Sequence, residues 1–116
     1  MRSSLTLFTL LLLSSAAVAQ WGHRTPPPAT SRTLIGVVTD AAGKPVPQAL
    51  VSLKDMKTNV VKTFIAEDDG GYRFHQLSFN VDYEVRADAD GKHSDTKTLS
   101  SFDTRSNAQI NLRLEK

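Results

Sequence analysis

The stretch 60–83, VVKTFIAEDDGGYRFHQLSFNVDY, constrains the fold of this 116-residue chain more than any other. An apolar run enters an acidic turn at 67–71 (EDDGG), and the chain leaves that turn through Tyr72 and Phe74. Glycine adopts the positive φ that a tight reversal needs, and aspartate side chains hydrogen-bond the turn backbone. Side chains two positions apart on a strand point the same way, so both aromatic rings can enter one core. The stretch therefore predicts a β-hairpin.

The chain beyond residue 33 repeats short apolar runs separated by turn residues. The expected strands are 34–39, 49–54, 60–66, one through Tyr72 and Phe74, 83–88, 96–99 and 110–114. Alternation is strict in 83–88, which predicts Tyr83, Val85 and Ala87 in the core and the three charged residues in water. One-sided alternation favours antiparallel pairing, because parallel strands are buried on both faces. With no amphipathic helix after the N-terminal segment, the sequence predicts an all-β, antiparallel seven-stranded sandwich.

The N-terminal residues 1–19 have the three regions of a signal peptide. Arg2 gives a short positive region, 5–13 form an apolar core, and 17–19 (AVA) fit the small-x-small cleavage pattern. The apolar core is shorter than the roughly 20 residues that a membrane-spanning helix needs. We therefore expect no membrane span, cleavage near Ala19, and export to the periplasm or the extracellular space.

Residues 20–32 are expected to be a Pro-rich disordered linker. The run 26–28 (PPP) favours an extended conformation, and its neighbours carry no hydrophobic period. The folded domain is then expected at 33–116. The whole chain holds 14 Lys and Arg against 12 Asp and Glu, but three of the basic residues precede the domain. Nucleic-acid-binding domains carry a clustered basic face, so no nucleic acid is expected as a partner.

The residues that could carry chemistry are scattered. Cysteine is absent, which excludes disulfides, a lipid-modified N-terminal cysteine and a cysteine nucleophile. His75 and His93 lie in polar turns or strand edges without a G-x-S-x-G motif, and scattered histidines do not make a zinc site. The acidic residues 67–69, and Asp88 with Asp90, lack the alternating spacing of an EF-hand loop. We therefore assign no catalytic, cofactor-binding or metal-binding residue and expect a protein that is not an enzyme.

The segment from Ser100 to Arg105 (SSFDTR) joins two expected strands and places an aromatic, an acid and a base side by side. One interpretation is that it forms a contact surface. The other, which we favour, is that Phe102 plugs the end of the sandwich while Asp103 and Arg105 pair or cap the turn.

Four segments of the domain follow the layout of a known family. They are 36–40 (GVVTD), 43–51 (GKPVPQALV), 69–74 (DGGYRF) and 83–87 (YEVRA). In this combination the chain resembles the carboxypeptidase regulatory-like domain, a transthyretin-like β-sandwich common in exported bacterial proteins, here as a stand-alone secreted bacterial member. The resemblance covers roughly 34–114 and implies a non-catalytic accessory module.

Two positions depart from the pattern of that family. Gln48 stands where the family usually has a glycine before Ala49, which suggests an altered turn or bulge. The family's Leu-Pro-Pro-Gly-x-Tyr turn is replaced at 77–83 by LSFNVDY, which is one residue longer. We therefore expect this loop to differ in conformation.

Binding is the function that these observations favour. An unknown protein or cell-envelope component would dock on a sheet face, a loop end or an exposed edge strand. The alternative is a carbohydrate-binding module, which needs a flat exposed aromatic; Trp21, Phe79 and Phe102 are the candidates. A weaker alternative is a small hydrolase, which would require His75 or His93 to lie with a carboxylate in a pocket.

Overall fold

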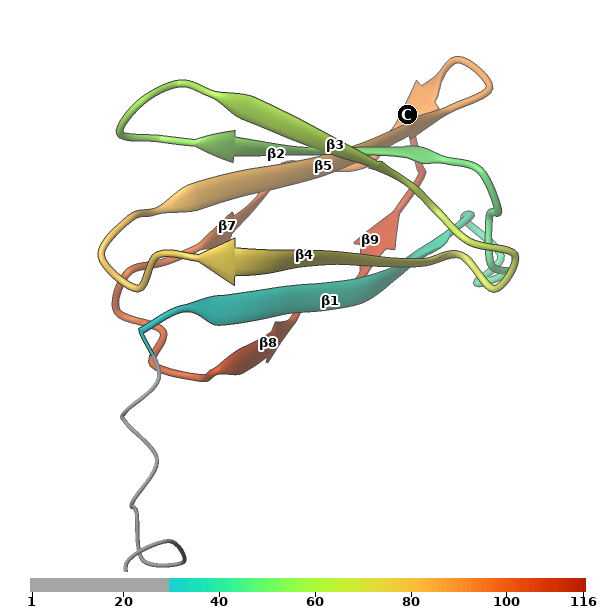
Figure 1. Ribbon diagram of the computed structural model, residues 1–116. Coiled ribbons are helices and arrows are strands. Elements are labelled where there is room, and N and C mark those ends of the chain that lie inside the picture. Colours follow the sequence, from blue (N-terminus) through green and yellow to red (C-terminus); the bar gives the residue numbers. More distant parts are fainter. Residues whose placement is uncertain (1–29) are drawn as a thin grey trace, which may run out of the picture.

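The computed structural model describes residues 30–116, which form two packed β-sheets (Figure 1). The predicted signal peptide at 1–19 and the linker residues 20–29 lie outside the described residues, so both stay predictions. Within the part of the chain that is described, no helix is long and apolar enough to cross a membrane.

Nine strands build the sandwich in the described range. They are β1 (Arg32–Thr39), β2 (Leu50–Asp55), β3 (Val61–Ile65), β4 (Gly71–Leu77), β5 (Tyr83–Ala89), β6 (Lys92–His93), β7 (Lys97–Leu99), β8 (Asn107–Gln109) and β9 (Leu112–Arg113). One sheet has the order β4-β1-β8, with β9 also pairing with β1; the other has the order β3-β2-β5-β6, with β7 also pairing with β5. The predicted β-sandwich is confirmed, with the short strands β6 and β8 in addition to the seven expected.

Alternating apolar residues of both sheets fill the space between them. In β5, Tyr83 is 7% exposed and Val85 and Ala87 are fully buried, as their alternation predicts. Tyr72 and Phe74 enter the same core from β4, also as predicted. The other buried apolar residues are Leu34, Val38, Ala49, Val51, Leu53, Ala66, Leu77, Leu99, Ala108, Leu112 and Leu114. Burying one large apolar side chain stabilises the fold by about 1.5–3 kcal/mol, so packing supplies what a chain without cysteine cannot take from disulfides.

The acidic turn at 67–71 connects the two sheets, so the predicted β-hairpin is wrong (Figure 1). β3 pairs with β2, whereas β4 pairs with β1. In the turn, Gly70 has φ of 78° and its N–H donates to the Glu67 carbonyl oxygen at 2.8 Å. A Cβ on Gly70 would lie 2.6 Å from the Val38 carbonyl oxygen, so the turn is tight against β1. Alternation along a strand fixes its buried face but leaves its pairing partner open.

One edge of β1 carries parallel partners. β4 pairs with β1 antiparallel, whereas β8 and β9 pair with it in parallel, so the antiparallel prediction fails for these two pairs. The strand predicted at 110–114 is shortened to β9, and Ile110 lies in the break between β8 and β9. The Ile110 N–H donates to the Ile35 carbonyl oxygen at 2.9 Å. The rule that parallel strands are buried on both faces applies to whole parallel sheets. Here only two or three residues of each strand pair in parallel at the edge of the sheet, so one face of β8 and β9 stays in water.

A buried hydroxyl ties the break at Ile110 to β4. Tyr72 is 2% exposed, and its hydroxyl donates to the Ile110 carbonyl oxygen. Burial raises the pKa of Tyr72, so the hydroxyl stays protonated. Its ring passes over Gly36, the cross-strand partner of Tyr72 in β1. A Cβ on Gly36 would lie 1.9 Å from the Ile110 oxygen and 2.5 Å from the ring, so only glycine fits there.

Gln48 occupies the conformation that glycine adopts most easily. Its φ is 64°, in the left-handed region that costs an L-residue about 1–2 kcal/mol. Its N–H still donates to the Ala66 carbonyl oxygen at 2.9 Å, which extends the pairing of β2 and β3. The departure from the family's usual glycine therefore strains the backbone and keeps this hydrogen bond.

Candidate functional site

Three loops gather at the end of the sandwich where β1 begins, at the left of Figure 1. They are 56–60 between β2 and β3, 78–82 between β4 and β5, and 100–106 between β7 and β8. We call this region the three-loop end. Its exposed large apolar side chains are those of Met56, Val60 and Phe102.

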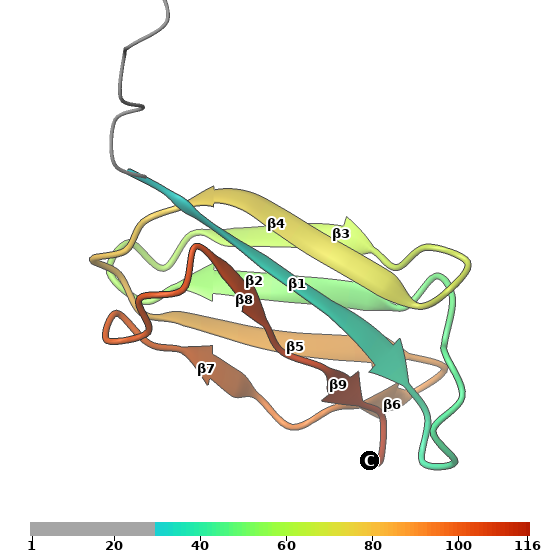
Figure 2. The same cartoon turned by 90° about the horizontal axis from the view of Figure 1, so that it is seen from below.

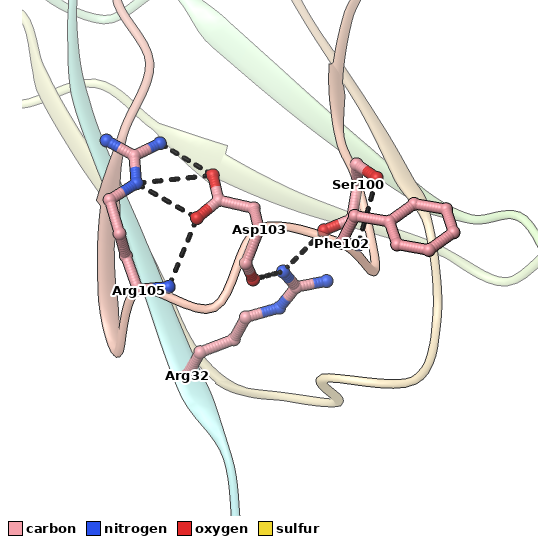
Figure 3. Close-up of polar contacts among 5 residues, drawn as sticks. All are labelled: Arg32, Ser100, Phe102, Asp103 and Arg105. Atoms are coloured by element: carbon pink, nitrogen blue, oxygen red, sulfur yellow. Dashed lines mark hydrogen bonds and ion pairs between the residues drawn. The ribbon is translucent and has the colours of Figure 1, made fainter.

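A buried arginine joins two of these loops to the first strand. Arg32 is only 1% exposed, and its guanidinium donates to four carbonyl oxygens. The bonds run from Nε to Ser78 at 3.1 Å, from Nη1 to Ser100 at 2.8 Å and Asp103 at 2.9 Å, and from Nη2 to Val81 at 2.8 Å. Figure 3 shows the two bonds from Nη1. Carbonyl oxygens carry partial negative charge, so they offset a burial that otherwise costs several kcal/mol.

Two aromatic rings complete the surroundings of Arg32. The guanidinium carbon lies 5.6 Å from the Phe79 ring centroid and 5.9 Å from that of Tyr83, within cation–π range. The Tyr83 hydroxyl accepts a hydrogen bond from Ser78 N at 2.9 Å, which holds the loop 78–82 from its other side. Among residues 30–116, no carboxylate forms an ion pair with Arg32. The guanidinium is therefore held by backbone and rings alone.

Asp82 connects the three loops to one another. Its Oδ1 accepts from Ser101 N at 2.6 Å, and its carbonyl oxygen accepts from Met56 N at 3.0 Å. The middle loop, 78–82, thus bonds to both of its neighbours. Together with the Arg32 bonds, these contacts make the three-loop end a preorganised surface.

Phe102 points into solvent from the third loop. Ser100 Oγ accepts from Phe102 N at 3.0 Å, and the Ser100 carbonyl oxygen accepts from Asp103 N at 3.0 Å, which closes a tight turn. Phe102 is 91% exposed, and Figure 3 shows its ring directed away from Arg32. The predicted plug is therefore wrong. The turn directs the ring outward, and Arg32 with its aromatic neighbours closes the end of the sandwich instead.

The predicted pairing of Asp103 with Arg105 is confirmed. Arg105 Nη2 lies 2.6 Å from Asp103 Oδ2, and the Arg105 backbone N–H donates to Oδ1 at 3.1 Å (Figure 3). The Arg105 side chain and backbone N–H lower the pKa of Asp103 to about 2. An exposed apolar ring thus stands beside a charged pair on a braced loop.

The other residues considered from the sequence lie apart. His75 is on β4, with Nδ1 3.3 Å from Thr33 Oγ1, whereas His93 is in β6 of the other sheet. Glu67 and Asp88 each pair with an arginine, at 3.1 Å and 3.0 Å. Across residues 30–116, no three His, Cys, Asp or Glu side chains are grouped to hold a metal ion.

The three aromatic candidates for a glycan platform also differ in placement. Trp21 lies outside the described residues, and Phe79 is half-buried against Arg32. Phe102 is the only exposed aromatic among residues 30–116.

Arg32 is the site residue that the sequence prediction missed. It lies in the segment 20–32, for which the proline run and the missing hydrophobic period predict a linker. A signal was nevertheless present: Arg32 lies two positions before Leu34, so the two share one face of the strand. Extending the alternation of β1 backward by one step would have placed an arginine in the core.

A model of the carboxypeptidase regulatory-like domain matches residues 33–115. The chain belongs to this family. The match covers the core strands and all three loops of the three-loop end, and it confirms the resemblance carried by the sequence motifs. No curated protein sequence matches the chain.

Solved structures similar to this carboxypeptidase regulatory-like domain come from diverse proteins. The major pilin subunit BcpA of Bacillus cereus is 14% identical with a TM-score of 0.58, covering 75% of this chain and 30% of the pilin. The shaft pilin SpaA of Lactobacillus rhamnosus GG is 11% identical with a TM-score of 0.53, covering 75% of this chain and 48% of SpaA. A dioxygenase domain from Streptomyces sp. SirexAA-E is 18% identical with a TM-score of 0.55, covering 76% of this chain and 81% of the domain. At these identities the likeness shows the fold alone, and the chain spans less than a third of the BcpA pilin.

Proposed function

We propose that this carboxypeptidase regulatory-like domain is an exported, non-catalytic binding module that docks on a protein of the cell envelope through its three-loop end. The observation that carries the proposal is the 91% exposure of Phe102 on a loop that Arg32 and Asp82 hold in place. Burying such a ring in an interface contributes about 1.5–3 kcal/mol. A loop that is already ordered loses little conformational entropy on binding.

A protein partner fits this surface better than a glycan does. Interface anchors are typically aromatic residues surrounded by polar groups, and Phe102 stands beside the Asp103–Arg105 pair. A glycan platform needs a flat exposed aromatic, whereas Phe102 projects singly from a turn. The carbohydrate-binding alternative rests on the same side chain, so one experiment addresses both.

Export is supported by the sequence of residues 1–19, with its positive, apolar and small-residue regions. A catalytic role has little support, because His75 and His93 lie in different sheets and neither forms an ion pair with a carboxylate of the described chain.

The test is a quantitative capture experiment with envelope extract from the producing cells. The protein and its Phe102→Ser variant are immobilised, and retained proteins and released glycans are both measured. Ile35→Ser is the matched control, because Ile35 is an exposed apolar residue of β1 that lies outside the three loops. We expect one protein to be retained and its retention to fall about tenfold or more with Phe102→Ser alone. Retention of glycan only would favour the carbohydrate-binding module, and retention unaffected by Phe102→Ser would contradict the proposed surface.

A further inference from the structure

β3 is a free edge strand of the five-stranded sheet (Figures 1 and 2). In the described chain it pairs with β2 alone. Val61 and Ile65, at its two ends, are 53% and 57% exposed. Monomeric proteins usually protect such an edge with bulges, prolines or several charges. β3 carries one charge, Lys62, and no proline.

The hydrogen bonds to β2 define which β3 backbone groups face the open edge. Bonds at the two ends of this pairing run from Asp55 N to the Val60 oxygen at 2.9 Å and from Ala66 N to the Ala49 oxygen at 2.8 Å. In an antiparallel pair, residues that bond to the partner strand alternate with residues that do not. The even-numbered residues of β3 therefore bond to β2. The odd-numbered residues direct their N–H and C=O groups outward.

We infer that β3 pairs antiparallel with β3 of a second copy of this chain, about a two-fold axis at Thr63. In this register Thr63 faces Thr63 of the second copy, and Val61 faces Ile65. These are the residues whose backbone groups point outward, so the two strands can exchange roughly six hydrogen bonds. The five-stranded sheets of the two copies then form one continuous sheet across the axis, and the interface uses the same patch on both copies.

Side chains on the outer face match in this arrangement. Leu50 of β2 lies beside Ile65 of β3 and is 39% exposed. When Ile65 pairs with Val61 of the second copy, these three side chains form an apolar row across the interface. Ser52 lies beside Thr63, which places a row of hydroxyl groups at the axis. Cross-strand apolar pairs and Thr–Thr pairs both stabilise a β-sheet.

The single charge of β3 selects this register and favours a second copy as the partner. An axis at Lys62 would place two ammonium groups opposite each other, which is destabilising. An axis at Thr63 places Lys62 opposite the uncharged Phe64, so no like charges face each other. Each exposed apolar side chain of β3 then faces an apolar side chain of β3 in the second copy, so the strand complements itself and needs no partner of different sequence.

The first test is the oligomeric state of the protein, expressed from the full-length chain, by sedimentation velocity over a range of concentrations. We expect a monomer–dimer equilibrium whose dissociation constant rises about tenfold or more with Val61→Lys, and likewise with Ile65→Glu. Ile35→Lys is the matched control, since Ile35 is 38% exposed on an internal strand, and it should leave the equilibrium unchanged. A protein that stays monomeric at about 1 mM would overturn the inference, and so would a dimer that both edge variants leave intact.

The register has its own test in the double variant Val61→Lys with Ile65→Glu. In the inferred pairing each new lysine faces a new glutamate of the second copy, so dimerisation should return to within about threefold of the unmodified protein. The two positions lie four residues apart on one strand, roughly 13 Å, which is too far for a rescue within one copy. Failure to rescue, with every variant folded by circular dichroism, would overturn the register. Thr63→Pro, which removes only an outward N–H, should also abolish the dimer.

Discussion

The guanidinium of Arg32 donates through Nη1 to the carbonyl oxygen of Asp103 at 2.9 Å, across 71 positions of sequence. The same nitrogen donates to the Ser100 carbonyl oxygen at 2.8 Å. These bonds bring the start of the first strand to the two ends of the turn that carries Phe102. The exposure of that ring therefore depends on a side chain that is itself buried.

Replacing Arg32 is expected to destabilise the whole domain. Arg32→Ala leaves four carbonyl oxygens without their donor, and we expect the free energy of unfolding to fall by about 2–4 kcal/mol. Arg32→Lys keeps the charge but lacks the planar fork, so it should recover less than half of that loss. Urea unfolding measures both. Arg73→Ala is the control, because its ion pair with Glu67 is half-exposed and should contribute under about 1 kcal/mol.

Hydrogen exchange separates the local effect from the global one. In Arg32→Lys, amides of the loop 100–106 should exchange faster than those of the core strands, because the loop loses contacts that hold it closed. Uniform acceleration would show that Arg32 stabilises the domain without bracing the loop.

The sequence was sufficient to predict buried faces but not strand partners. Tyr83, Val85 and Ala87 follow a period of two, and a period of two has one physical outcome, a strand with one buried face. The acidic turn at 67–71 has two outcomes, because tight turns with glycine connect strands within a sheet and also between sheets. The close approach of Gly70 to β1, where a Cβ would clash, decides between these two outcomes. This contact is distant in sequence, so the turn residues alone do not predict it.

Gly36→Ala should be the most damaging single-methyl change in the domain. The new Cβ would lie 1.9 Å from the Ile110 carbonyl oxygen and against the Tyr72 ring, so β1 and its parallel partners would have to separate. We expect a loss of more than about 3 kcal/mol in the free energy of unfolding, measured in urea, or no folded protein. Gly43→Ala is the control: its φ is 84° but nothing lies within 4 Å, so the cost should be about 1 kcal/mol. Equal losses in the two variants would contradict this account.

Gln48→Gly should stabilise the domain. The left-handed backbone at φ 64° strains glutamine but suits glycine, and the gain outweighs the extra freedom of glycine in the unfolded chain. We expect the free energy of unfolding to rise by about 0.5–1 kcal/mol in a thermal or urea experiment. Asn59→Gly, at φ 63°, should give a smaller gain, because asparagine tolerates this conformation better. A loss of stability with Gln48→Gly would show that its side chain makes a compensating contribution.

Only part of the candidate site could be predicted from the sequence. The Asp103–Arg105 pair follows from local chemistry, because residues two apart in a turn are close whatever the rest of the fold does. The direction of Phe102 does not, since it depends on whether the end of the sandwich is already filled. Arg32 and the half-buried Phe79 fill that end, and neither contact is local in sequence.

The Asp103–Arg105 pair should titrate well below ordinary carboxylates. Hydrogen bonds from the Arg105 side chain and backbone lower the pKa of Asp103 from 3.8 to about 2. Because the folded-state pKa is the lower one, the pair stabilises the folded protein above about pH 4, and this contribution is lost as the pH falls through about 2. Carbon NMR shifts of the carboxyl groups, recorded between roughly pH 6 and pH 1.5, should show this low midpoint for Asp103. Arg105→Gln should raise the midpoint toward 3.8. The carboxylate of Asp55, whose pKa is lowered by backbone N–H groups of its own turn, should titrate unchanged in that variant; a shared shift would mean that Arg105→Gln acts on the fold and not on the pair.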